Sequence, residues 1–282
     1  MIENNETIDE FLARHADDVE EAVRKAAAQE IMPRRRRLGA HEVDEKTGPH
    51  DLVTDADRKA ELFLTEALSA LLPGSVVVGE EAVHANPASY EALHGEAPVW
   101  IVDPVDGTRQ FVHGDPGFCT LVALAHHGVV RASWTYAPVP DRMATAIRGR
   151  GAFLDGERLH AGPPEPGREL RVATSHPDYT TDEQKRALLG LRTPGVAPRA
   201  CGSAGLEYLA VARGELDATA FSWEAAWDHA AGLLLVEEAG GTHLTRTGEP
   251  FRITGDNDLP FTAARDAATA RRVVALLAGE AA

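Results

Sequence analysis

Residues 100–111 read Trp-Ile-Val-Asp-Pro-Val-Asp-Gly-Thr-Arg-Gln-Phe, an apolar run that ends abruptly in two carboxylates, a proline and a glycine. The apolar residues from Val99 to Val102 are typical of a buried strand. We expect the chain to turn at Pro104, because proline has no N–H to donate to a strand ladder. The stretch therefore predicts a strand that delivers polar groups to one edge of a sheet.

Asp103 and Asp106 lie three residues apart across the expected turn, so both carboxylates can point to one place. Gly107 and Thr108 follow directly and can offer backbone N–H groups to an anion. Together these groups suit a phosphate held through a cation. An acidic surface turn is the commoner meaning of such a motif alone, so the interpretation depends on the rest of the chain.

The composition is that of an acidic protein of 282 residues, long enough for one large domain or two small ones. Asp and Glu number 44 against 28 Lys and Arg, and the formal charge of −16 disfavours direct binding to nucleic acid or to an anionic membrane. The sequence shows no signal peptide or long apolar span. Cys119 and Cys201 form no Cys-x-x-Cys pair and the histidines are scattered, so a cytoplasmic location is expected and a zinc site is not.

Two amphipathic helices are expected in the first part of the chain. Apolar residues spaced between charges predict one helix over residues 8–32. Residues 38–50 lack periodicity and are expected to form a loop, and the basic run Arg34–Arg37 is assigned no catalytic role. The second helix begins after Thr54, its expected N-cap. Its Asp57 faces the interior, where a carboxylate must be neutralised or given hydrogen-bond donors.

Strands are expected to follow. A strand over residues 75–78 runs into Gly79-Glu80-Glu81, so a second strand ends in carboxylates. Three further apolar runs predict an antiparallel meander, at residues 119–125, 129–136 and 143–147. Residues 161–168 contain three prolines and two glycines and mark the expected boundary between two domains. We expect residues 1–165 to form an α+β domain with most of the candidate ligands, and residues 166–282 to form an α/β domain.

Helices and strands alternate in the second half, which indicates α/β organisation. The most distinctive segment begins at Trp227-Asp228, is apolar on nearly every face and ends in Gly240-Gly241, so it predicts a buried helix. Asp228 lies in its first turn, where a carboxylate is tolerated. The other expected elements are strands at 170–173, 216–221, 242–244 and 261–263 and helices at 182–191, 203–213 and 264–277.

Five carboxylates thus stand at the ends of buried elements, namely Asp57, Glu80, Asp103, Asp106 and Asp228. If they gather in one place, they repel one another strongly unless a cation neutralises them. Mg²⁺ suits such a site, because it prefers oxygen ligands and leaves coordination positions for water and phosphate.

These residues resemble the inositol monophosphatase family. The chain carries in order a Gly-Glu-Glu at 79–81, an Asp-Pro-Val-Asp-Gly-Thr at 103–108, and a Trp-Asp at 227–228 followed by Glu-Ala-Gly-Gly at 238–241. Residues 51–57, Asp-Leu-Val-Thr-Asp-Ala-Asp, are also similar to a family pattern, and the similarity runs from about residue 10 to about residue 275. Each motif alone is weak, but the combination is specific.

The resemblance implies a layered α-β-α-β-α sandwich, a homodimer, and a lithium-sensitive phosphatase that hydrolyses phosphate monoesters with two or three Mg²⁺ ions. By position, Glu80, Asp103 and the Val105 carbonyl would hold the first metal. Asp103, Asp106 and Asp228 would hold the second.

The resemblance also implies how substrate and water are held. Asp57 and Thr108 would orient the attacking water, with Glu80 counted among the catalytic residues, and the amides of Gly107 and Thr108 would meet the phosphate oxygens. The other expected substrate contacts are Ser203, Ala204, Phe221 and Asp228.

The substrate itself is less clearly indicated. Members specific for inositol carry a glutamate seven residues before the Trp-Asp aspartate, and here that position is Phe221. Arg109-Gln110 also replaces a common Thr-Asn or Lys-Asn. A phosphorylated cyclitol, amino alcohol or nucleotide remains open, and a non-catalytic relative that binds a protein or RNA partner is the alternative in another class.

Overall fold

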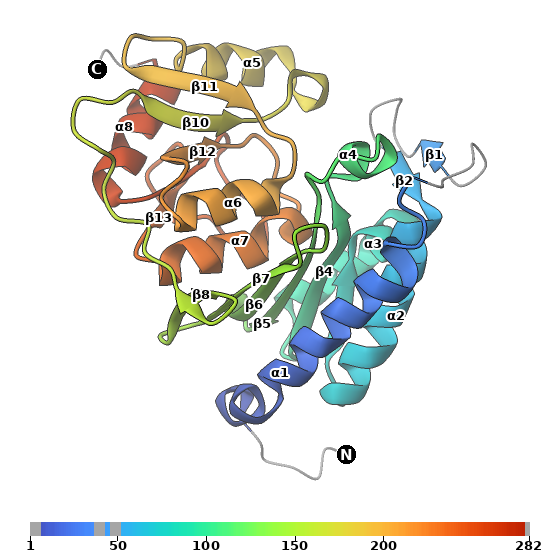
Figure 1. Ribbon diagram of the computed structural model, residues 1–282. Coiled ribbons are helices and arrows are strands. Elements are labelled where there is room, and N and C mark those ends of the chain that lie inside the picture. The colour runs from blue at the N-terminus through green and yellow to red at the C-terminus, as the bar shows by residue number, and fades with distance from the viewer. Residues whose placement is uncertain (1–6, 37–42, 46–51, 280–282) are drawn as a thin grey trace.

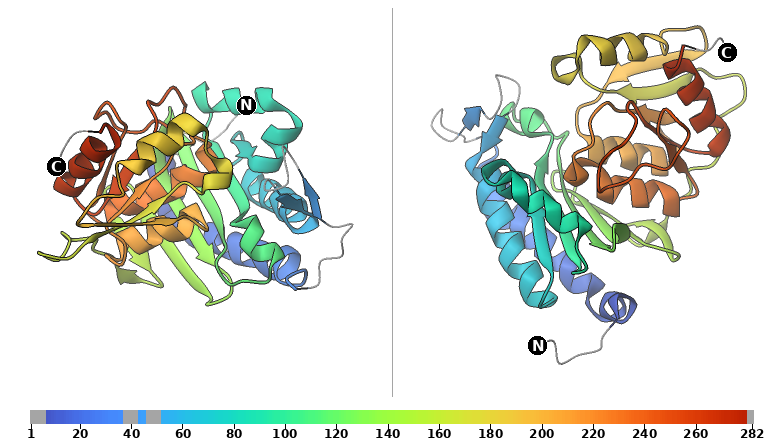
Figure 2. Two further views of the ribbon diagram at one scale, coloured as in Figure 1. Left: turned by 90° about the horizontal axis from the view of Figure 1, so that it is seen from above. Right: turned by 180° about the vertical axis from the view of Figure 1, so that it is seen from behind.

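The computed structural model describes residues 7–36, 43–45 and 52–279, whose helices and two large sheets stack in five layers (Figure 1). The layers are helix, sheet, helix, sheet and helix, and Figure 2 shows the same succession from two further sides. The predicted α-β-α-β-α sandwich is therefore confirmed. In the part of the chain that is described, no helix has the length and apolar character needed to cross a membrane.

The first outer layer consists of α1 (Ile8–Ala26) and α2 (Asp55–Leu71). A π-helical segment (Ala27–Ile31) continues α1, so the predicted helix over 8–32 is confirmed. Thr54 caps α2 as expected, and it forms a capping box with Asp57. The buried faces of both helices pack on the large sheet through an apolar cluster that includes Val19, Leu64, Trp100 and Trp134.

The large sheet has seven strands in the order β3-β4-β5-β6-β7-β8-β9. Only β3 and β4 are parallel, and the remaining pairs are antiparallel, as the predicted meander requires. The strands are β3 (Val76–Gly79), β4 (Val99–Asp106), β5 (Cys119–His126), β6 (Val129–Ala137), β7 (Arg142–Ile147), β8 (Gly151–Leu154) and β9 (Glu157–Arg158). Short helices follow β3 and β4, namely α3 (Glu80–Ala85), η3 (Pro87–His94) and α4 (Thr108–Val112).

The turn expected at Pro104 needs correction, because β4 continues through Pro104 to Asp106. The ladder with β5 is interrupted instead: Asp103 pairs with Leu121 and Asp106 with Cys119, and the register shifts between them. Proline has no N–H to donate, and a bulge accommodates it without ending the strand.

The middle layer consists of α6 (Ala204–Ala212) and α7 (Ala226–Glu238), and it is covered on both sides. Leu234 and Leu235 of α7 belong to the core cluster of the seven-stranded sheet, while Leu233 and Val236 belong to the core of the other sheet. A helix covered on both sides must be apolar all round, which explains the sequence pattern of α7.

The second sheet has five strands in the order β11-β10-β12-β14-β13. They are β10 (Leu170–Thr174), β11 (Val196–Ala200), β12 (Ala218–Ala220), β13 (Thr242–Leu244) and β14 (Thr262–Ala264). Helices α5 (Asp182–Leu189) and α8 (Ala267–Leu277) form the last layer. The sequence did not predict β11. It lies at the edge of the sheet, where Pro198 is tolerated because its missing N–H costs no ladder bond.

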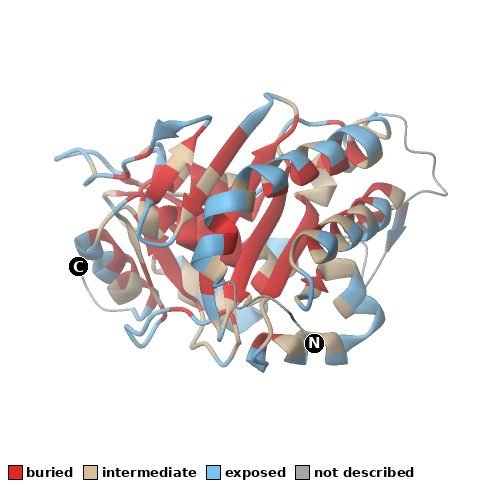
Figure 3. Ribbon diagram, turned by 90° about the horizontal axis from the view of Figure 1, so that it is seen from below, coloured by how far each residue is buried: buried red, intermediate tan, exposed pale blue. Residues whose placement is uncertain are grey.

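The prediction of a loop over residues 38–50 is wrong for residues 43–45. Residues Val43–Glu45 form β1, which pairs antiparallel with β2 (Leu52–Thr54). The remainder of the expected loop and Arg37 lie outside the described residues. Figure 3 shows that burial concentrates in the strands and in the helix faces that pack on them.

Candidate active site

A pocket of about 560 Å³ opens where β3 and β4 end. The two strands are parallel, so their carboxyl ends lie at the same edge of the sheet. This edge brings together Glu80, at the start of α3, and the end of β4. Residues of α4 and residues from beyond β10 in the chain complete the wall. Its polar or aromatic members include Thr108, Arg109, Gln110, His176, Cys201, Trp223, Trp227 and Asp228.

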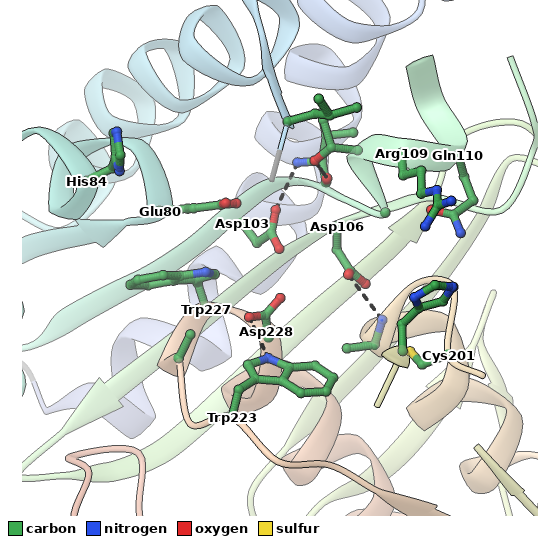
Figure 4. A pocket seen from close by; sticks show the side chains of 18 of the residues that line it. Glu80, His84, Asp103, Asp106, Arg109, Gln110, Cys201, Trp223, Trp227 and Asp228 are labelled. Carbon is green, nitrogen blue, oxygen red and sulfur yellow. Dashed lines mark hydrogen bonds between the residues drawn. The ribbon is translucent and has the colours of Figure 1, made fainter. Parts of the chain in front are cut away.

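A cluster of three carboxylates forms one side of the pocket. Asp103, Asp106 and Asp228 each offer an oxygen, and these oxygens lie within 4.8 Å of one another (Figure 4). Burial raises the pKa of Asp103 well above its usual value, and the charges of Glu80, Asp106 and Asp228 raise it further. An all-oxygen donor set with this much mutual repulsion fits a hard divalent cation.

Asp106 is held by the N-terminus of α6. Its carboxylate accepts hydrogen bonds from Ser203 Oγ at 2.6 Å, from the Ala204 amide at 3.1 Å and from the Gly205 amide at 2.7 Å. Burial raises the pKa of Asp106, and these donors partly oppose that rise. Gly205 is required for the approach, because a Cβ there would lie 2.7 Å from Cys119 Sγ and 3.1 Å from Asp106 Oδ2.

The segment after Asp103 is held by its own hydrogen bonds. The Val105 amide donates to Asp103 Oδ1 at 3.0 Å, and Thr108 Oγ1 donates to the Val105 carbonyl at 3.0 Å. Gly107 has φ 93°, a left-handed conformation that favours glycine, and a Cβ there would lie 3.0 Å from the Gly117 carbonyl oxygen. The chain can thus turn from β4 into α4 beside the carboxylates.

Asp228 reaches the cluster from the first turn of α7. Its Oδ2 accepts a hydrogen bond from the indole nitrogen of Trp223 at 2.8 Å, which is drawn in Figure 4. This bond fixes one carboxylate oxygen and so restricts how the side chain can turn.

Most of the residues expected from the sequence meet at this pocket. Those that line it are Glu80, Asp103, Val105, Asp106, Gly107, Thr108, Ala204 and Asp228. Three others do not line it: Asp57, Ser203 and Phe221. Ser203 lies behind Asp106, to which it donates, and is itself buried.

Asp57 is buried, as its inward-facing position predicted. Its carboxylate accepts hydrogen bonds from the amide and the hydroxyl of Thr54. Burial raises the pKa of Asp57 to about 7, and the charge of Glu80 adds to the rise. Its hydrogen-bond partner is Thr54, and it does not itself line the pocket.

Phe221 is completely buried and packs against Tyr208 and Phe261. An aromatic side chain at this point of the strand therefore belongs to the core, and the expected substrate contact at Phe221 is not seen. Trp223, two residues later, lines the pocket in its place.

No role was predicted from the sequence for Trp223 or His176, which line the pocket, or for Glu61. The Glu61 carboxylate accepts from the amides of Glu81 and Ala82, both at 2.8 Å, and so holds the first turn of α3 just after Glu80. Burial raises the pKa of Glu61 to about 7. Its position four residues after Asp57 placed it on the same side of α2, which was a usable signal.

The rim of the pocket carries cationic and polar groups. Arg109 from α4 forms an ion pair at 3.1 Å with Asp178, which belongs to the short helix η4 (Pro177–Tyr179). His176 Nδ1 accepts from the Asp178 amide at 3.3 Å. Arg109 and His176 both line the pocket, and each contacts Asp178.

Comparisons with known proteins agree with this site. A model of the inositol monophosphatase family matches residues 13–277. The inositol-1-monophosphatase of Bacillus subtilis is 35% identical over 214 residues, which are 74% of this chain and 78% of that protein. The inositol-1-monophosphatase of Rhizobium meliloti is 39% identical over 204 residues, which are 69% of this chain and 72% of that protein.

Solved structures show the same architecture. A Thermotoga maritima IMPase superposes with a TM-score of 0.76 at 26% identity, covering 95% of this chain and 97% of that one. The extragenic suppressor protein suhB from Bartonella henselae gives a TM-score of 0.74 at 27% identity, covering 96% and 98%.

Proposed function

Since the chain belongs to the inositol monophosphatase family and is thus a metal-dependent phosphomonoesterase, we propose that it hydrolyses a small phosphorylated alcohol with two or three Mg²⁺ ions. The observation that carries the metal site is the convergence of Asp103, Asp106 and Asp228 within 4.8 Å. Cations bound there would neutralise a cluster that repels itself. The non-catalytic alternative loses support, because the curated relatives reported above are named as phosphatases.

The ligands are assigned by position and supported by the pocket wall. Glu80, Asp103 and the Val105 carbonyl would hold one Mg²⁺, and Asp103, Asp106 and Asp228 would hold a second. When bound, the cations supply Lewis acidity toward water and toward the phosphate oxygens. The hydrogen bonds from α6 to Asp106 and from Trp223 to Asp228 keep these carboxylates in place.

The remaining roles belong to the turn between β4 and α4. The amides of Gly107 and Thr108 would bind phosphate oxygens, and Ala204, which also lines the pocket, would contact the ester. We assign the orientation of the attacking water to the Thr108 hydroxyl. Asp57 then has a positioning role, because its carboxylate is bonded to Thr54 and does not line the pocket.

Four further proposals follow. The resemblance supports inhibition by Li⁺ and a homodimer, and the absence of a Cys-x-x-Cys pair supports a cytoplasmic location. The chain divides near residue 165: the strands of the seven-stranded sheet end at Arg158 and those of the five-stranded sheet begin at Leu170.

Phosphate release from a panel of monoesters tests the function. The panel contains inositol 1-phosphate, glycerol 2-phosphate, histidinol phosphate and a nucleoside monophosphate, each assayed with Mg²⁺ and with a chelator. We expect turnover of at least one ester that the chelator abolishes and added Mg²⁺ restores. Absence of turnover on every ester, or turnover that persists with the chelator, would contradict the proposal.

A further inference from the structure

The wall of the pocket beside α7 is aromatic. Trp223 and Trp227 both line the pocket, and each is partly exposed there. Among the described residues that line it, the carboxylates are Glu80 and the three aspartates of the cluster. All four are assigned to metal, so they are not available as partners for the hydroxyl groups of an alcohol.

Trp223 is held rigidly. Its indole N–H donates to Asp228 at 2.8 Å, and its ring packs on Phe221 at a centroid distance of 4.5 Å and on His229 at 5.0 Å. Phe221 and His229 are completely buried, so they support the indole from the core. The indole of Trp223 is therefore already ordered before a ligand binds, so little side-chain entropy would be lost when a ligand packs on its remaining surface.

The position of Trp223 relative to the phosphate is set by Asp228. Asp228 belongs to the carboxylate cluster and is bonded to the indole of Trp223 (Figure 4), so a phosphate bound at the cluster would lie near that indole. An alcohol group one or two bonds from the ester oxygen then lies against the indole. Planar rings gain from such contact through stacking as well as through burial.

We propose that the preferred substrate is a phosphate monoester whose alcohol carries a planar aromatic or heteroaromatic ring, which stacks on Trp223. This inference rests on the phosphomonoesterase function proposed above and narrows its substrate class. Polyhydroxylated rings are poorer ligands for this wall, because an indole whose N–H is already used offers their hydroxyls no hydrogen bond.

Two esters of matched leaving group test the proposal. Benzyl phosphate and cyclohexylmethyl phosphate are both esters of primary alcohols and of similar size, but only benzyl is planar. We expect the wild type to prefer benzyl phosphate by about tenfold in kcat/KM. The corresponding phosphonates, which are not hydrolysed, should show the same preference in binding measured by calorimetry.

Three variants separate stacking from the anchoring of Asp228. The quantity compared is the ratio of kcat/KM for benzyl phosphate to kcat/KM for cyclohexylmethyl phosphate. Trp223→Phe keeps a ring but loses the N–H, so kcat/KM should fall for both esters while this ratio is unchanged. Trp223→Leu loses both the ring and the N–H, so the ratio should fall to about one, whereas Trp227→Leu removes only the other indole and should leave the ratio unchanged.

The outcomes are distinct. A wild-type ratio near one, a ratio retained in Trp223→Leu, or a ratio lost only in Trp227→Leu would overturn the inference while leaving the phosphatase intact. If no ester of either panel is hydrolysed with Mg²⁺, the proposed function itself fails. Thermal melting of each variant confirms that it is folded.

Discussion

Ser203 Oγ lies 2.6 Å from Asp106 Oδ2, so the cap residue of α6 also holds a carboxylate at the end of β4. The two residues belong to different layers of the molecule and are joined inside the core, where both are buried. The geometry of the candidate metal site therefore depends on how the middle layer packs on the large sheet.

Ser203→Ala should lower both the stability of the folded protein and the affinity of the site for Mg²⁺. Loss of a buried hydrogen bond to a carboxylate is expected to lower the free energy of unfolding by about 2 kcal/mol, measured by urea denaturation. The Mg²⁺ dissociation constant, from calorimetry, should rise. Ser89→Ala is the control, because the Ser89 hydroxyl makes one exposed bond to the Asn86 carbonyl. Equal stability of the two variants would argue against the role of Ser203.

Asp228→Asn should remove most metal binding and activity with the fold retained. The amide oxygen can still accept from Trp223, but the charge that a hard cation needs is gone. We expect Mg²⁺ affinity to fall by at least about tenfold. Asp258→Asn, at a surface ion pair with Arg246, is the control and should bind Mg²⁺ as the wild type does. Near-native turnover of Asp228→Asn would refute the assignment.

Thr108→Val should lower kcat and leave KM nearly unchanged. The hydroxyl is bonded to the Val105 carbonyl and is assigned to the attacking water, whereas the amides assigned to phosphate remain in the variant. Thr108→Ser keeps the hydroxyl and should recover most of the rate. A raised KM with an unchanged kcat would instead place Thr108 in substrate binding.

The metal-free protein should lose stability as the pH rises through the range where Asp57 ionises. The folded pKa of about 7 exceeds the unfolded value, so the folded state holds a proton that the unfolded state releases above about pH 4. The contribution of protonated Asp57 to the free energy of unfolding is complete below about pH 4. It falls by roughly 1 kcal/mol per pH unit until about pH 7.

The comparison that isolates Asp57 is the wild type against Asp57→Asn, both with a chelator. The buried His229, whose pKa burial lowers to about 3, acts in the opposite direction below its unfolded pKa, and it is common to both proteins. The stability difference between them, from urea denaturation, should shrink from pH 5 to pH 7. A difference that grows over this range would show that Asp57 is ionised in the folded protein.

The sequence predicted the elements of this fold well because most of them carry local signals. The cap at Thr54, the periodicity of α1 and the apolar strands of the meander can each be recognised within a few residues. The edge strand β11 could not, since Pro198 suggests a loop until its position at the sheet edge is known.

The pocket-lining carboxylates were predictable for the same reason, because each lies in the last residues of a strand or in the first turn of a helix. Their partners were not, since Ser203 lies 97 residues from Asp106 in the chain. The choice between Phe221 and Trp223 as the pocket wall also depends on packing against α7, which no local pattern contains.

The bonds between Asp106 and α6 have a consequence for protein synthesis. Asp106 accepts a hydrogen bond from the amide of Gly205, which is 99 residues later in the chain. All strands of the seven-stranded sheet precede Gly205, so they are synthesised before this partner exists. Until then the end of β4 carries aspartates that cannot be buried without partners. We therefore expect that edge of the sheet to close only when α6 packs on it, in the same step that assembles the candidate active site.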